Sequence, residues 1–373
     1  MMENKVKKTF LNLMGIAGIT VNGDNPYDIR VHDDNFYDRV FNQTILGLGE
    51  SYMDKWWDCQ ALDLFFEKVL RADLLDKIQK DWTTTWNIFK AKMFNLQTMR
   101  RAFIVGKNHY DLGNDLYLAM LDKKMQYTCG YWRDSNTLDA AQEAKLAMIC
   151  TKLDLRPGMD IVELGCGFGG FAKYVAQEYG ARVTGFTVSK EQAEFAKKLC
   201  KDLPVNIRLD DYRNASGHYD RVVSIGMIEH VGYKNYRTYM KLTSQLLKKD
   251  GIAFIHTIGS NTSSKICNPW TRKYIFPNSM LPSITQLGKA MEGIFVMEDW
   301  QNFGEDYDKT LMAWYRNFKQ AWPELKDKYG ERFFRMWEYY LLSCAGGFRS
   351  REMQLWQIVM TKPGKKRPDW RIS

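Results

Sequence analysis

The sequence predicts an α/β protein whose core is a Rossmann-like, seven-stranded, mostly parallel sheet, preceded by a small helical domain. The first observation is segment 159–170, where a short apolar run reaches Glu163 and then breaks into four glycines before a helix-like stretch. Strand, glycine turn and helix in this order form the first crossover of a nucleotide-binding sheet. The second is the alternation of strand-like and helix-like segments beyond residue 107. The length of 373 residues allows one large domain or two modest ones.

Each element follows from the local spacing of apolar residues. Short apolar runs bounded by turn residues predict strands over 159–164, 182–187, 205–209, 219–225, 251–257, 294–299 and 353–360. Apolar residues at helical spacing predict helices over 139–153, 169–179, 189–201, 234–248, 308–328 and 331–345. Six strands in βαβ rhythm and a late seventh indicate a doubly wound sheet. The long connection over 259–293 carries Trp270, Tyr274 and Phe276, and we expect it to form a lid or substrate wall.

The chain before residue 107 is expected to fold separately from the sheet. One apolar helix face is formed by Leu62, Phe65, Phe66, Val69 and Leu70. The N-terminal lysines and apolar residues lack a small-residue cleavage site, so they predict an amphipathic helix and not a signal peptide. We therefore expect a lipid-associated helical domain over 1–88, a basic helical linker over 89–106 and a catalytic domain over 107–373.

Composition narrows the class of protein. No apolar run reaches the ~18 residues that a membrane-spanning helix needs. The seven cysteines are scattered without a C-x-x-C pair, which favours a reducing cytoplasm and predicts no metal site. Residues 1–100 carry 13 Lys and Arg against 14 Asp and Glu, whereas the rest carries 40 against 30. This basic excess fits a solvated face, nucleic acid or phospholipid headgroups, and charge alone does not choose among them.

The glycine loop fits two classes of cofactor. Gly165, Gly167 and Gly170 satisfy the dinucleotide pattern G-x-G-x-x-G, which in nicotinamide enzymes precedes an acid by about 20 residues. The second strand here runs into Thr187 with no acid. Glu163 sits just before the first glycine, where a carboxylate can reach a cationic amino-acid moiety. The pattern therefore favours S-adenosylmethionine, whose ammonium and sulfonium are both positive.

Chemistry is expected just beyond the carboxyl ends of the strands, where ligands of such sheets bind. Glu229 follows the fourth strand, His256 lies at the end of the fifth and Tyr307 follows the sixth, while Cys129 lies upstream of the sheet. Each has an ordinary structural explanation when taken singly, such as a helix-terminal carboxylate or a small buried thiol. Their joint placement at one rim favours a shared site.

With these residues in view, the chain resembles the bacterial cyclopropane-fatty-acyl-phospholipid synthases and, more distantly, the mycolic acid cyclopropane synthases. The likeness covers nearly the whole chain, and its N-terminal part resembles the phospholipid-acting group. The motifs that carry it are Gly47-Leu-Gly-Glu-Ser-Tyr-Met-Asp, His109-Tyr-Asp-Leu-Gly-Asn-Asp-Leu, Gln126-Tyr-Thr-Cys, Glu163-Leu-Gly-Cys-Gly-Phe-Gly-Gly, Gly226-Met-Ile-Glu-His-Val-Gly, His256-Thr-Ile-Gly-Ser, Tyr274-Ile-Phe-Pro-Asn, Glu298-Asp-Trp and Tyr307-Asp-Lys-Thr-Leu-Met-Ala-Trp. Phe168 departs from the family, which often has Trp there, and we expect little consequence.

The resemblance implies the Rossmann-like fold of S-adenosylmethionine-dependent methyltransferases. It implies methylene transfer to the cis double bond of an unsaturated phospholipid acyl chain, through methyl transfer, a carbocation and deprotonation by a bound bicarbonate. The implied catalytic residues are Glu229, His256, Tyr307 and Cys129, which also bind bicarbonate together with the backbone of Ile258. The cofactor site is expected to comprise Tyr127, Glu163, Gly165, Cys166, Gly167, Thr187, Ser189, Gln192, Asp211 and Tyr212.

The expected partners are a phospholipid bilayer surface and a second copy of the chain in a homodimer. We expect a cytoplasmic protein attached peripherally to the inner face of the membrane. The candidate contact regions are the aromatic-rich segment Leu46–Trp57 and the basic stretch Lys90–Arg101.

Alternative functions remain open at this stage. A fatty-acyl C-methyltransferase shares the carbocation and leaves a methyl branch in place of a ring. A small-molecule N-methyltransferase is disfavoured by the N-terminal domain and the basic linker. A nucleic-acid methyltransferase is disfavoured because no Asn/Asp-Pro-Pro-Tyr element follows the fourth strand. A non-catalytic lipid-binding protein requires Glu229 and His256 to point away from the pocket.

Overall fold

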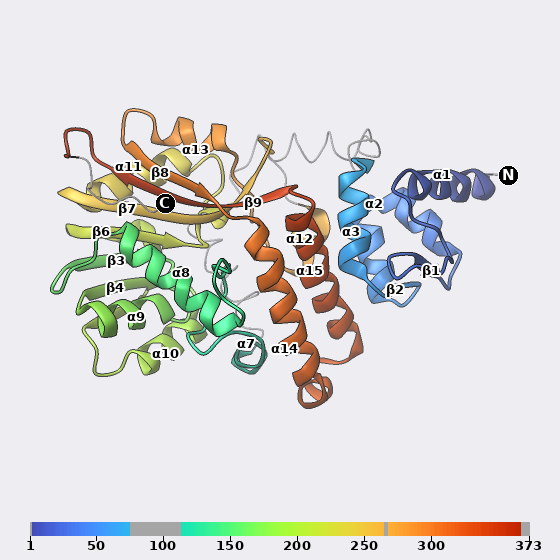
Figure 1. Ribbon diagram of the computed structural model, residues 1–373, viewed down its shortest axis with the longest axis horizontal. Helices are drawn as coiled ribbons and strands as arrows, with labels where there is room; N and C mark the ends of the chain where they lie inside the picture. Colours follow the sequence, from blue (N-terminus) through green and yellow to red (C-terminus); the bar gives the residue numbers. More distant parts are fainter. Residues whose placement is uncertain (1, 75–112, 265–267, 367–373) are drawn as a thin grey trace. The chain divides into compact units, whose positions relative to one another are not determined.

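The computed structural model describes residues 2–74, 113–264 and 268–366, and its contacts divide the chain into two compact units (Figure 1). Neither unit is a single stretch of chain. The first unit comprises Met1–Phe94, Ile266–Pro277 and Tyr307–Met353, and the second comprises Asn95–Lys265, Asn278–Asp306 and Gln354–Ser373. The sequence boundaries at residues 88 and 106, and the linker between them, fall outside the described residues and stay predictions.

The second unit is built on a seven-stranded sheet of order β5-β4-β3-β6-β7-β9-β8. Its strands are β3 (Asp160–Leu164), β4 (Arg182–Thr187), β5 (Val205–Leu209), β6 (Tyr219–Ile225), β7 (Leu247–Ser260), β8 (Val296–Asn302) and β9 (Met353–Thr361). Strands β3 to β7 pair in parallel, whereas β8 and β9 are antiparallel. The predicted seven-stranded, mostly parallel sheet is confirmed.

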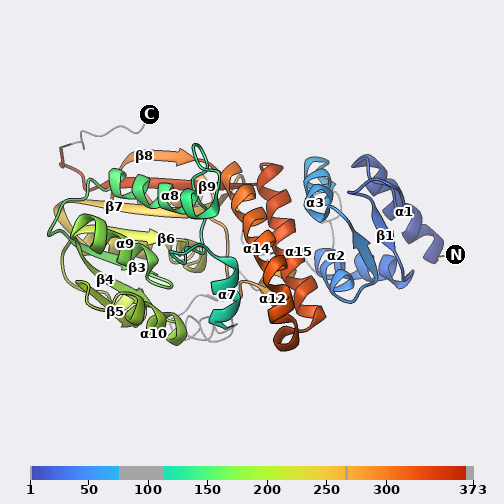
Figure 2. The same ribbon diagram turned by 60° about the horizontal axis from the view of Figure 1, so that its bottom comes forward.

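Helices cover both faces of this sheet (Figure 2). One face carries α8 (Leu138–Lys152), α9 (Gly170–Tyr179) and α10 (Lys190–Leu199), and the other carries α11 (Tyr236–Leu246) and α13 (Ile284–Met291). The unit also contains α7 (Asn114–Met120) and short 3₁₀ turns at Tyr212–Asn214 and Ile228–His230. Helices α7 and α13, at seven and eight residues, are too short to show a clear helical period and were not predicted.

Alternation along the strands assigns each side chain to one of two cores. Val162 and Val222 pack in the cluster beneath α11 and α13. Their neighbours Ile161 and Val223 pack in the cluster beneath α8 and α9. Glu163 is two residues beyond Ile161, so it shares the α8 and α9 side. The carboxylate before the glycine loop is therefore buried against helices and not exposed at the sheet edge.

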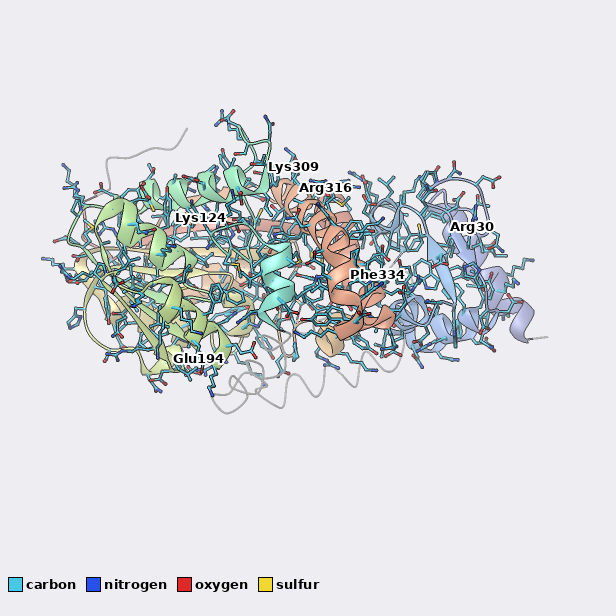
Figure 3. All side chains as sticks on the ribbon, turned by 90° about the horizontal axis from the view of Figure 1, so that it is seen from below. Arg30, Lys124, Glu194, Lys309, Arg316 and Phe334 are labelled. Carbon is cyan, nitrogen blue, oxygen red and sulfur yellow. The ribbon has the colours of Figure 1, made fainter. Side chains whose placement is uncertain are left out.

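The first unit gathers helices from both ends of the chain. It contains α1 (Met2–Ile16), β1 (Ile29–Val31), α2 (Asn35–Met53), β2 (Trp57–Cys59), α3 (Leu62–Arg71), α12 (Pro269–Tyr274), nearly all of α14 (Glu305–Tyr329) and α15 (Glu331–Arg349). Helix α15 packs on α2 and α3, and β1 and β2 form an antiparallel pair. On α15, Phe334 stacks on Phe318 of α14 with ring centroids 5.4 Å apart (Figure 3). The predicted α1 and α3 are present.

The segment Leu46–Trp57 belongs to the interior of the first unit. Tyr52 and Trp57 are buried, and a Cβ on Gly49 would collide with the indole of Trp270. Trp56 is only partly buried, and the prediction that this segment contacts a membrane stays a prediction. The other predicted contact, Lys90–Arg101, lies outside the described residues.

The connection over 259–293 is divided between the two units, with Ile266–Pro277 in the first unit and the flanking residues in the second. Trp270 is buried in the first unit, with its ring centroid 4.5 Å from that of Tyr339. The hydroxyl of Tyr274 donates to Glu50 Oε1 at 2.8 Å. These two aromatic residues therefore anchor α12 to α2 and α15.

Among the described helices, none combines the length and apolar character required to span a bilayer.

Candidate active site

The glycine loop between β3 and α9 is held in left-handed backbone conformations. Gly165, Gly167 and Gly169 have φ of +87°, +52° and +82°. The N–H groups of Gly165 and Cys166 donate to the carbonyl of Phe186 on β4, at 3.0 and 2.8 Å. A Cβ on Gly167 would meet no heavy atom within 4 Å. The loop thus presents bare backbone to open space at a helix N-terminus, which suits a ligand.

Glu163 supplies a buried carboxylate beneath this loop. It is 2 % exposed, and its Oε2 has no hydrogen-bond partner among the described residues. Burial raises the pKa of Glu163 to about 8, an effect opposed by the nearby ammonium of Lys145. A cationic ligand group placed beside Glu163 would stabilise its charged form. The amino-acid end of S-adenosylmethionine provides such a group.

The end of β4 carries a hydroxyl and an amide where a nicotinamide enzyme would carry an acid. The hydroxyl of Thr187 donates to Gln192 Oε1 at 3.0 Å. Ser189 caps α10 by accepting from the Gln192 backbone N–H at 3.3 Å. All three side chains are buried. Ser189 thus has a structural role as the helix cap, and the cofactor contacts predicted for Thr187, Ser189 and Gln192 stay predictions.

Asp211 and Tyr212 follow β5 at the same edge of the sheet. The N–H of Asp210 donates to the carbonyl of Thr187 at 3.0 Å, which joins the ends of β4 and β5. Asp211 is fully buried and accepts from the backbone N–H and the guanidinium of Arg213, both at 2.9 Å. The ring of Tyr212 packs edge-on against Tyr239 at 5.5 Å. Both residues thus follow β5 next to the end of β4, and their contact with the cofactor stays a prediction.

Helix α8 holds the segment that carries Tyr127 and Cys129. Lys145 Nζ donates to Gln126 Oε1 at 2.5 Å and to Thr128 Oγ1 at 3.1 Å. Cys129 is fully buried, and its thiol donates to the Gly130 carbonyl at 3.1 Å. Sequence reasoning missed Lys145, which is also fully buried. The signal was its position on the buried face of α8, four residues after Ala141 and four before Ile149.

Three segments converge because glycines let them approach closely. A Cβ on Gly170 would collide with the Lys124 carbonyl and the Gln126 side chain. A Cβ on Gly165 would lie 2.7 Å from Met227 Cγ, and one on Gly226 would lie 2.8 Å from Thr128 Cγ2. The glycine loop, segment 126–129 and the loop after β6 are therefore in mutual contact. A shared site formed by Cys129, Glu163 and Glu229 stays a prediction.

An aromatic cluster lies beside this junction. The ring of Tyr117 on α7 is 5.2 Å from that of Tyr127 and 5.3 Å from that of Phe168. Phe168 also packs edge-on against Phe195 of α10 at 5.5 Å. The ring of Phe168, where the family often has Trp, thus fills a well-packed place in the glycine loop.

The reactive end of the site contains a carboxylate and an imidazole. Glu229 Oε1 accepts from the backbone N–H of Ile258 at 2.8 Å, and Gly226 N–H donates to the His256 carbonyl at 2.8 Å. Glu229 Oε2 and His256 Nε2 are buried and have no partner among the described residues. Burial raises the pKa of Glu229 to about 7 and lowers that of His256 well below its usual value. Two buried polar atoms without partners among the described residues can hold a small polar species and move a proton.

Tyr307 belongs to the first unit, unlike Glu229 and His256. It lies on α14 in the first unit, where its ring is buried and packs edge-on against Phe348 at 4.5 Å. Its place beside Glu229 and His256 stays a prediction.

Comparisons with known proteins agree with this geometry. Residues 97–358 match the family model described as mycolic acid cyclopropane synthetase. The chain is 53% identical over 350 residues to cyclopropane-fatty-acyl-phospholipid synthase of Escherichia coli strain K12, covering 94% of this chain and 92% of that one. It is 31% identical over 337 residues to sphingolipid C9-methyltransferase A of Emericella nidulans, covering 81% of this chain and 65% of that one.

Solved structures give the same family. The mycolic acid cyclopropane synthase CmaA1, crystallised with SAH and CTAB, is 30% identical with a TM-score of 0.66, and the match covers 70% of this chain and 98% of that one. The cyclopropane synthase MmaA2 of Mycobacterium tuberculosis is 27% identical with a TM-score of 0.65 and the same coverage. The predicted S-adenosylmethionine-dependent methyltransferase fold is thereby confirmed. The chain belongs to the mycolic acid cyclopropane synthetase family.

Proposed function

We propose that this protein is a cyclopropane-fatty-acyl-phospholipid synthase. It transfers a methylene from S-adenosylmethionine to the cis double bond of an unsaturated phospholipid acyl chain. The observation that carries the proposal is that Glu229 Oε2 and His256 Nε2 are both buried without a partner among the described residues. Glu229 lies in the turn after β6 that contacts the glycine loop, and His256 lies on the adjacent strand β7. The identity of 53% over 94% of the chain to a synthase of that name supports the substrate class.

The physical demands of the reaction match this site. An alkene is a weak, uncharged nucleophile, so the enzyme must align it with the sulfonium methyl. Methyl transfer leaves a carbocation on the acyl chain, which water would trap as an alcohol. The buried site excludes water. Phe303, whose ring centroid lies 5.9 Å from that of His256, can offer its aromatic face to the cation.

The residues present also fit a bicarbonate ion. His256 Nε2 and Glu229 Oε2 are a buried nitrogen and a buried oxygen without partners, and bicarbonate both accepts and donates hydrogen bonds. Cys129, Glu229, His256, Ile258 and Tyr307 would hold it, and when bound it supplies the base that takes a proton from the former methyl group. Ile258 acts through its N–H, which donates to Glu229 Oε1 and orients that carboxylate. His256 and Glu229 orient the ion and exclude water from it.

The test is analysis of phospholipids after incubation with the purified protein and S-adenosylmethionine. We expect unsaturated chains to gain the mass of one methylene and to lose their olefinic proton signals, with cyclopropane signals in their place. Glu229→Gln, matched in size, serves as the inactive control. A new methyl branch would assign the protein as a fatty-acyl C-methyltransferase. No change in any phospholipid would refute both assignments.

We further propose that the protein docks as a homodimer on the cytoplasmic surface of an anionic bilayer. The support is the net charge of +10 beyond residue 100, since each basic residue near such a surface contributes roughly 1 kcal/mol. Vesicle binding should be stronger on anionic than on neutral lipid and should weaken as salt rises. If vesicle binding depended on neither lipid charge nor salt concentration, the excess of basic residues would only form a solvated face. Sedimentation should give twice the chain mass of 43.7 kDa.

A further inference from the structure

Gln357, which lies outside every motif of the sequence, contacts the imidazole of His256. It stands on β9 and is fully buried. Its Nε2 lies 3.3 Å from His256 Nδ1. The other atom of each group, Gln357 Oε1 and His256 Nε2, has no hydrogen-bond partner among the described residues. The contact therefore involves one specific nitrogen of the ring and leaves the other nitrogen for the site.

The chemistry of the two groups determines where the ring proton lies. A side-chain amide nitrogen donates hydrogen bonds and cannot accept one. With the Gln357 amide oriented as in this structure, His256 Nδ1 accepts, which requires a lone pair on that nitrogen. In a neutral imidazole the single N–H is then on Nε2.

Several surroundings keep the ring neutral. His256 is 1 % exposed, and burial lowers its pKa well below the usual value, helped by the ammonium groups of Lys145 and Lys152. Phe303 covers the ring edge-on at 5.9 Å. A neutral ring with one fixed tautomer is a directional donor.

We infer that Gln357 is a positioning residue that fixes His256 as its Nε2–H tautomer, so that the ring donates a hydrogen bond into the active site. Only one part of the inference rests on the proposed function, namely that the acceptor of the Nε2–H hydrogen bond is an oxygen of the anion that serves as base. The ring orientation and the tautomer are properties of the protein alone. A His256 with the opposite tautomer would present a lone pair to the anion and repel it.

The direct test is NMR of the full chain labelled with ¹⁵N at histidine. Long-range ¹H–¹⁵N correlations distinguish the two neutral tautomers, and loss of signals in His256→Gln assigns the ring among the five histidines. We expect the Nε2–H tautomer in the wild type. Gln357→Glu replaces the donor by an acceptor and should convert the ring to Nδ1–H. Gln357→Leu removes the restraint and should give signals of both tautomers.

The kinetic consequence follows from loss of one donor to an anion. Such donors contribute about 10²–10³-fold to kcat, so Gln357→Glu should lower kcat by about 10²-fold with an unchanged KM for S-adenosylmethionine. The matched control is Gln354→Leu. Gln354 is also buried on β9, but it donates to Asn261 at 3.1 Å and accepts from Asn302 at 3.0 Å. This control should keep both the tautomer and kcat.

Two results would overturn the inference. One is the Nδ1–H tautomer in the wild type, which would mean that the Gln357 amide is reversed and accepts through Oε1. The other is an unchanged Nε2–H tautomer in both Gln357→Glu and Gln357→Leu. Failure of the proposed function is a separate outcome, because absence of a cyclopropane product would leave the tautomer measured in the unliganded protein unaffected.

Discussion

Gly167→Ala tests directly where S-adenosylmethionine binds. A Cβ at Gly167 meets no protein atom within 4 Å, so the substitution adds no steric overlap within the fold. The remaining cost comes from φ of +52°, because the left-handed conformation costs an L-residue about 1–2 kcal/mol. We expect a fall of a few degrees in melting temperature, at about 2–4 °C for each kcal/mol. The methyl group should occupy space that the ligand needs and raise its Kd by about tenfold or more, which corresponds to about 1.4 kcal/mol.

Gly180→Ala is the matched control for backbone strain. Gly180 ends α9, has φ of +61°, and a Cβ there would make ordinary contact with Pro157 at 3.6 Å. It should lose about the same stability as Gly167→Ala while binding S-adenosylmethionine normally. Isothermal titration calorimetry gives the Kd, and thermal unfolding gives the stability. If Gly167→Ala binds the cofactor as tightly as wild type, or if both variants lose binding equally, the assignment of the loop is wrong.

Three further substitutions test other parts of the structure. Glu229→Gln should lower kcat by about 10²–10⁴-fold while S-adenosylmethionine binding by calorimetry is retained, and full activity would exclude its role. Burial alone would raise the pKa of Glu50, but hydrogen bonds from Lys273, Tyr274 and Arg39 outweigh burial and lower this pKa to about 2. Because the folded state favours the ionised carboxylate, the free energy of unfolding of the wild type should fall as pH drops from about 4.5 to about 2. Glu50→Gln should flatten that dependence in urea titrations, and an unchanged slope would contradict the pairing. Gly49→Ala should cost about 1–3 kcal/mol through overlap with Trp270, and a melting temperature equal to wild type would show that the indole moves freely.

The sheet was predictable because its signals are local. Strands such as β3, β4 and β6 are short apolar runs that end at glycine or polar turns, and their carboxyl ends carry the motif residues. The placement of Glu163 and Thr187 followed from these runs and the known polarity of a parallel sheet. The three-residue strands β1 and β2 form through pairing with each other and, for Ile29, with Val21, and no local pattern predicts them.

The composition of the first unit could not be predicted because it depends on contacts between distant segments. Helix α15 joins α3 through Gly346, where a Cβ would lie 2.5 Å from the Asp63 carbonyl oxygen. No feature of the sequence around Gly346 identifies α3 as the helix that it contacts. Lys145 and Gln357 were missed for a related reason. Each stands inside a buried run without a motif, and its importance follows only from the polar atom it meets.

The contacts of α2 have a consequence for synthesis of the chain. Glu50 pairs with Tyr274, 224 residues later, and the Tyr52 hydroxyl donates to Glu338, 286 residues later. At ~5–20 residues per second, ribosomes deliver these partners roughly 10–60 s after α2 has emerged. During that interval strands β3 to β8 of the second unit are made, whereas β9 follows α15, and Gly49 and Tyr52 lack their covering helices. We therefore expect the nascent N-terminal segment to bind chaperones and a chain truncated before α15 to aggregate, because the apolar surface of α2 stays uncovered in both.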